Sequence, residues 1–178
     1  MTSHPTPPPA AIHAVSAGAR PRGSVAALPS VTRTQRFIVP AEPARVFPLL
    51  CPVREFDWIP TWHAEILHSV SGVAEEDCVF RTEAHDGAAM TWVVSRYEPP
   101  TRIEFTCFVP GHYVFRLKIS LEPVAGGTQL TWTRHWLATA PADAAFSAAT
   151  AVEDFDTKMA ALEGLLVHYL RTGEMLRP

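Results

Sequence analysis

Arg134 is the residue whose type and surroundings point most directly to chemistry. It is the only charged member of the alternating series Leu130, Trp132, Arg134 and Trp136. A guanidinium on an apolar face must find a partner or reach water, because an unpaired buried charge is too costly. Arg134 is therefore expected to anchor a ligand carboxylate, carbonyl or phenolate, to form an internal ion pair, or to extend past the end of the sheet. Three carboxylates are candidate partners for the ion pair: Asp57, Glu104 and Asp156.

His63 is a second candidate, because an imidazole near neutrality can transfer protons. The alternative is an ordinary surface histidine at a strand start. Together with His68, His85, His112 and His135 it shows none of the usual metal-ligand spacings, so no metal site is expected. The chain also has no glycine-rich phosphate loop and no G-x-S-x-G motif, and no cofactor is expected.

Two predicted hairpins position Arg134. Apolar residues alternate with polar ones from Tyr113 to Leu121 and again from Leu130 to Trp136, which is typical of half-buried strands. A two-residue turn at Gly126-Gly127 would set Leu121 opposite Trp132, Ile119 opposite Arg134 and Leu117 opposite Trp136. A three-residue loop from Val109 to Gly111 would set Phe105 opposite Phe115 and Ile103 opposite Leu117. Both registers give one broad aromatic face that carries Arg134.

The other elements follow from the same patterns. Further strands are expected at 32–39, 63–70, 78–83 and 90–98, and short helical turns at 44–50 and 53–58, where Pro48 and Pro52 interrupt. The direction in which Trp92 and Val94 point is left open. From Asp143, a predicted N-cap, the period changes to 3.6 and predicts a helix of about 28 residues that ends near Arg171 and Gly173. The fold class is α+β with about seven strands. The apolar stripe of the helix comprises Val152, Phe155, Met159, Leu162, Leu166 and Tyr169.

Composition limits the possible functions. The 178 residues suggest one folded domain at 31–176, preceded by a Pro/Ala-rich tail at 1–30 that is expected to be disordered; a targeting segment is the alternative. A net charge of −3 gives no basic field for nucleic acid, and no apolar run is long enough to span a bilayer. The three cysteines, without C-x-x-C spacing, suggest core residues in a reducing, cytoplasmic compartment.

Several segments carry a family resemblance. The chain resembles the START/Bet v 1-like superfamily over Thr32 to Leu176. The resemblance rests on the order of elements, on the stretches 44–50 and 97–103, on Trp58 just after the short helices, and on Gly126-Gly127-Thr128-Gln129-Leu130-Thr131-Trp132. The greatest likeness is to its bacterial polyketide cyclase and Hsp90-activator-like members. The resemblance implies a helix-grip fold, in which a curved antiparallel sheet wraps around the C-terminal helix and leaves a cavity between them. The predicted elements are consistent with such a cavity, because a curved sheet cannot contact a straight helix along its whole length.

The resemblance implies a carrier or sensor for a small, mostly apolar molecule such as a lipid, polyketide or aromatic metabolite. Arg134 and Trp58 are expected to orient this ligand, although Trp58 and Trp62 could instead cap one end of the core. Two alternatives stay open: a cyclase, aromatase or dehydratase that uses Arg134 or His63, and a partner-binding module that uses the exterior of the sheet. The oligomeric state is left open. The expected cavity walls are Trp92, Phe105, Phe115, Leu117, Trp132, Phe155 and Met159.

Overall fold

The computed structural model describes residues 28–83, 87–110, 113–139 and 148–177, and for 148–154 the backbone alone. Several expectations fall outside these residues: the tail up to residue 27, the cap at Asp143, the side chain of Val152, and His85 and His112.

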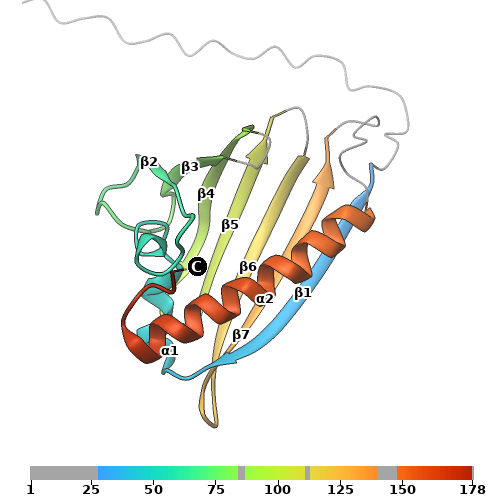
Figure 1. Cartoon of the computed structure of the whole chain (residues 1–178). Coiled ribbons are helices and arrows are strands. Elements are labelled where there is room, and N and C mark those ends of the chain that lie inside the picture. Colours follow the sequence, from blue (N-terminus) through green and yellow to red (C-terminus); the bar gives the residue numbers. More distant parts are fainter. Residues whose placement is uncertain (1–27, 84–86, 111–112, 140–147, 178) are drawn as a thin grey trace, which may run out of the picture.

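Seven antiparallel strands form one sheet in the order β1-β7-β6-β5-β4-β3-β2 (Figure 1). The chain thus runs across the sheet from β2 to β7, and β1 is added beside the last strand. The predicted α+β class is confirmed, and the strand predicted at 63–70 is shorter than expected. The strands are β1 (Ser30–Val39), β2 (Glu65–His68), β3 (Val79–Glu83), β4 (Ala89–Glu98), β5 (Arg102–Val109), β6 (Tyr113–Val124) and β7 (Gly127–Ala138).

Short helical turns follow β1. These are α1 (Pro43–Val46), the 3-10 turn η1 (Phe47–Leu50) and the 3-10 turn η2 (Glu55–Asp57). Pro43 opens the first turn without losing a needed hydrogen bond, and Pro48 and Pro52 keep each piece short. The turns carry the buried side chains of Val46, Phe47, Leu49 and Leu50 into one end of the core.

The long helix α2 (Ala148–Thr172) lies across one face of the sheet and approaches β1 most closely (Figure 1). Gly173, at φ +74, ends it as expected, and its N–H donates to the Tyr169 carbonyl at 2.8 Å. The predicted stripe is confirmed at its best-buried positions: Phe155, Met159 and Leu166 are buried against the sheet. The face of the sheet that carries α2 is called the inner face below.

The predicted register of the β6–β7 hairpin is wrong by two residues. Leu117 lies opposite Arg134, and Leu121 lies opposite Leu130. The pairing closes at Val124 and Gly127, so the turn comprises Ala125 and Gly126 rather than Gly126 and Gly127. Gly127 already belongs to β7, where a Cβ atom would collide with the backbone carbonyl of Val39. Because the shift is an even number, every side chain keeps its predicted face.

The β5–β6 hairpin is shifted in the same way. Phe105 pairs with Leu117 and Ile103 with Ile119, and the ladder closes at Val109 and Tyr113. The loop therefore begins one residue later than the predicted loop from Val109. The open question about β4 is also answered, because Trp92 and Val94 are both buried on the inner face.

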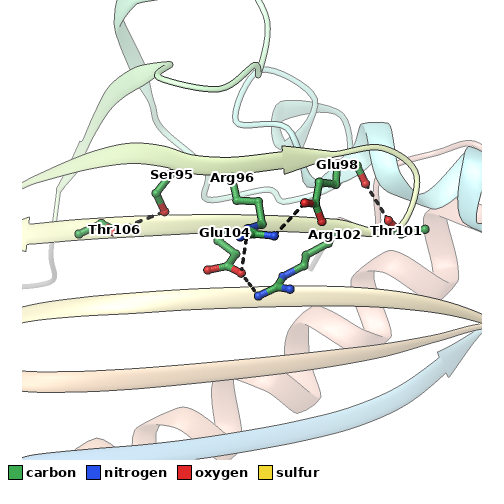
Figure 2. Close-up of polar contacts among 7 residues, drawn as sticks. All are labelled: Ser95, Arg96, Glu98, Thr101, Arg102, Glu104 and Thr106. Atoms are coloured by element: carbon green, nitrogen blue, oxygen red, sulfur yellow. Dashed lines mark hydrogen bonds and ion pairs between the residues drawn. The ribbon is translucent and has the colours of Figure 1, made fainter.

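The outer face of β4 and β5 carries a charged network (Figure 2). Arg96 contacts Glu98 at 2.8 Å and Glu104 at 3.6 Å, and Arg102 forms an ion pair with Glu104. These side chains cover the solvent side of the two strands. No helix in the described part of the chain is long and apolar enough to cross a membrane.

Candidate functional site

The inner face carries a continuous series of aromatic rings. Phe80 stacks on Trp92 at 5.6 Å between centroids, and Trp92 meets Phe115 edge to face at 5.0 Å. Phe115 lies 6.4 Å from Trp136, which meets Phe155 of α2 edge to face at 5.7 Å. The series runs from β3 through β4, β6 and β7 to the helix. We call this series the aromatic wall; its neighbouring rings are stacked or edge to face except for Phe115 and Trp136, which are tilted at 44°.

Arg134 lies within this aromatic wall. Its Cζ atom is 4.8 Å from the ring centroid of Phe115, 5.5 Å from that of Trp136 and 5.8 Å from that of Phe155. These distances are within the range of cation–π attraction, which holds a guanidinium without removing its charge. Arg134 also remains partly accessible to solvent. The residue thus faces inward as predicted, with its cation among aromatic rings.

Two of the three predicted acidic partners of Arg134 are wrong. Asp57 accepts a hydrogen bond from the Nε atom of Arg54 at 2.6 Å, on the exposed side of η2. Glu104 pairs with Arg96 and Arg102 on the opposite face of the sheet (Figure 2). Asp156 is exposed on α2. Neither Asp57 nor Glu104 is available to neutralise a cation on the inner face.

The other predicted wall residues are also brought together. Phe105 makes edge-to-face contacts with Phe80 and Trp92. Leu117, Trp132 and Met159 are buried in the same core cluster. The indole Nε1 of Trp132 is buried and has no hydrogen-bond partner among the described residues. A buried donor without a partner is rare in native proteins and calls for an acceptor.

Trp58 is in the core, which is the second of its two predicted roles. It has no exposed surface, and its indole N–H donates to the Leu49 carbonyl at 2.9 Å. Trp62 makes the equivalent bond to the Pro52 carbonyl at 2.8 Å but is only partly buried. The two tryptophans therefore tie residues 58–62 to the short helical turns that precede them.

His63 is exposed just before β2, which matches the interpretation as a surface histidine. His135 lies on the outer face, where its Nδ1 is 3.3 Å from the hydroxyl of Thr32. Within the described residues, no group of three or more His, Cys, Asp or Glu side chains could hold a metal ion.

Sequence reasoning missed Arg33 on β1. It is paired directly with Arg134, and its neighbours Gln35 and Phe37 are paired with Trp132 and Leu130. Directly opposite residues of an antiparallel ladder share a face, so Arg33 belongs to the inner face. Arg33 and Phe37 are an even number of positions apart in the strand predicted at 32–39, so they share a face. The missing information was that β1 pairs with β7.

Glu55 of η2 was also missed, whereas the three cysteines are buried as predicted. Protein surrounds the carboxyl of Glu55, and this desolvation raises the pKa of Glu55 well above its ordinary value, although the residue as a whole is partly exposed. On β5, burial raises the pKa of Cys107 to about 12, against a smaller lowering effect of the Arg134 charge. Cys107 is therefore a neutral thiol, and Cys51 and Cys78 are likewise buried and unpaired.

Comparisons with known proteins agree with this architecture. A model of the family described as polyketide cyclase / dehydrase and lipid transport matches residues 30–166. No curated protein gives a significant match.

Solved structures show the same fold at low identity. Ara h 8.0201 has a TM-score of 0.62 and 18% identity, covering 81% of this chain and 99% of its own. CalU16 from Micromonospora echinospora has a TM-score of 0.53 and 22% identity, covering 80% and 74%. DynU16, from the dynemicin biosynthetic locus, has a TM-score of 0.57 and 20% identity over 80% of this chain. The match covers 48% of DynU16, so this chain spans about half of its length.

These likenesses confirm the helix-grip fold. The family model covers well over half of the sequence, including every strand and most of α2. The chain belongs to the polyketide cyclase / dehydrase and lipid transport family.

Proposed function

We propose that this protein binds a small, mostly apolar molecule between the inner face of the sheet and α2. The observation that carries the proposal is the aromatic wall around Arg134, a guanidinium that lies among three rings on a residue that is only partly buried. Apolar walls with a few polar groups are the usual composition of a small-molecule site. The residues assigned to the walls are Trp92, Phe105, Phe115, Leu117, Trp132, Phe155 and Met159.

The arrangement of α2 supports the same proposal. Among the described residues the helix backbone approaches β1 most closely, so α2 lies nearer to one edge of the sheet than to β4, β5 and β6. Large aromatic side chains project from the inner face of β4 and β6, namely Trp92 and Phe115. A guest with flat or flexible apolar surface would complete the contacts of this wall.

The experiment is to add bulk at the wall. Leu117→Trp places an indole next to Arg134, on a residue that is 5% exposed. If ligand space exists there, the variant keeps its stability and its affinity for the neutral dye Nile red falls at least tenfold. Leu137→Trp is the matched control, because Leu137 is 37% exposed on the outer face of β7 and should change neither property.

The opposite result is equally clear. If side chains already fill the region, overpacking costs about 1–3 kcal/mol of unfolding free energy. Such a loss in Leu117→Trp, together with absent dye binding by the wild type, would overturn the proposal. Native mass spectrometry of the purified protein provides an independent test, because a bound apolar molecule should appear as an added mass.

The role of Arg134 is tested by Arg134→Met. Loss of ligand affinity with little change in melting temperature would support an anchoring role. Loss of folding without a specific loss of affinity would indicate a structural cation.

Glu55 favours a second candidate function, an enzyme of the cyclase, aromatase or dehydratase type. A carboxyl whose pKa is raised by desolvation is the kind of group that can act as a general acid or base. Conversion of the bound molecule over time, seen by mass spectrometry and abolished in Glu55→Gln, would support this candidate. Unchanged ligand mass after long incubation would favour simple binding.

A further inference from the structure

Two arginines lie side by side on the inner face of this protein. Arg33 of β1 is directly opposite Arg134 of β7 in the antiparallel ladder. Cβ atoms at such positions are typically about 4.5–5.5 Å apart, within reach of a single small group. Like charges at directly opposite positions destabilise a sheet. Arg33 therefore calls for a compensating interaction of its own.

The surroundings of Arg33 do not supply one. Its guanidinium donates to the neighbouring Thr32 carbonyl at 3.2 Å, and within the described ranges it forms no ion pair. Its Nε atom is buried and has no hydrogen-bond partner among the same residues. Half-buried guanidinium groups normally satisfy their fixed fork of donors with carboxylate or phosphate oxygens.

The adjacent inward position on β7 repeats the pattern. Trp132 is 3% exposed, and its buried indole N–H is also without an acceptor among the described residues. Its cross-strand partner is Gln35, a further hydrogen-bonding side chain on β1. Unused donors thus occur on both strands, on the face that also carries the aromatic wall. An anion with several oxygens is the chemical group that such donors match.

We propose that Arg33 and Arg134 together bind the oxyanion head group of the ligand, which is therefore an amphipathic molecule with an apolar body and a carboxylate or phosphate at one end. This proposal rests on the proposed function and narrows it to an anionic ligand class. The aromatic wall contacts the body of the ligand. The two guanidinium groups contact its head from neighbouring strands, as forks suited to paired oxygens.

The experiment compares three probes with the same alkyl chain: dodecanoate, dodecyl phosphate and dodecanol. Isothermal titration calorimetry on the full chain should show that at least one anion binds the wild type about tenfold or more tightly than the alcohol, as charge-assisted hydrogen bonds allow. Which anion binds more tightly distinguishes a carboxylate from a phosphate ligand. Arg33→Met should remove most of that preference.

Two further variants complete the design. Arg36→Met removes one positive charge from the exposed side of the same strand and should retain the wild-type preference, which separates a local site from a change in net charge. Arg33→Lys keeps the charge without the planar fork and should show an intermediate preference.

The outcomes separate the two proposals. Equal affinities of the wild type for dodecanoate, dodecyl phosphate and dodecanol, or an undiminished preference in Arg33→Met, would overturn the anion site and leave apolar binding intact. Failure of all three probes to bind would overturn both proposals. Melting temperatures within the experimental error of the wild type confirm that each variant is folded.

Discussion

Replacing Trp58 by Phe tests whether this residue is purely a core side chain. The indole N–H donates to the Leu49 carbonyl at 2.9 Å in a fully buried setting. Phenylalanine leaves that carbonyl unpaired, which costs about 1–3 kcal/mol. The smaller ring also leaves a void, which costs about 1 kcal/mol or more. The expected loss of unfolding free energy is therefore about 2–4 kcal/mol.

Trp62→Phe is the matched control. It removes a hydrogen bond of nearly the same length, 2.8 Å to the Pro52 carbonyl, but from a partly exposed residue. Water can replace the lost donor there, so the expected cost is only about 0.5–1.5 kcal/mol.

The assay is urea unfolding followed by far-ultraviolet circular dichroism, which does not depend on the replaced fluorophores. A changed midpoint with an unchanged slope reports stability alone. For a chain of this length the loss in Trp58→Phe corresponds to roughly 5–15 °C in melting temperature. Equal losses in the Trp58 and Trp62 variants would refute the reasoning. So would a loss of Nile red affinity in Trp58→Phe at full stability, which would assign Trp58 to the ligand.

Three further predictions concern protonation and backbone geometry. Glu55→Gln should stabilise the protein at about pH 8 and have no effect at about pH 4. The reason is that a raised pKa of Glu55 makes the folded state lose stability as the pH rises above the unfolded value of about 4.5. Thermal melts at several pH values check this, and Glu76→Gln, at an exposed position, should give no such gain. Cys107, with a pKa of about 12, should resist iodoacetamide at about pH 8 in the native protein and react after unfolding, as mass spectrometry would show; rapid native alkylation of Cys107 would contradict its burial. Gly127→Ala should lower the melting temperature far more than Gly126→Ala. The Cβ atom added at Gly126 meets no neighbouring atom, so that variant loses only about 1 kcal/mol of unfolding free energy for its positive φ. Similar melting temperatures of the two variants would contradict the close approach of β1 to Gly127.

The side-chain faces could be predicted from the sequence, whereas the pairing could not. Alternation alone placed Phe115, Leu117 and Arg134 on one face, because side-chain direction repeats every two residues. Register depends on which residues form the turn, and two adjacent glycines made Gly126-Gly127 the obvious choice. The decisive constraint on Gly127 is the backbone of β1, a distant segment. Local turn preferences carry no information about that contact.

The candidate site shows the same division. Arg134 stood out because it interrupts an apolar series, and its inward direction is observed. Its relation to Arg33 depends on the pairing of β1 with β7, which no local pattern in either segment indicates. Asp57 and Glu104 were plausible partners by charge, but they belong to local ion pairs with Arg54 and Arg102. Glu55 was missed because burial of one carboxyl in a short helical turn has no signature in composition or spacing.

The position of β1 beside β7 has a consequence for biosynthesis. In the described sheet β7 is the sole hydrogen-bonded neighbour of β1, so the strand that leaves the ribosome first must wait for the one made last. Until then, its inward arginine and phenylalanine face solvent and the sheet cannot be completed. Such non-local pairing slows folding and prolongs the exposure of apolar surface. A nascent chain stopped before Gly127 should therefore have no stable inner face, and the sheet should be completed only once Ala138 has cleared the exit tunnel.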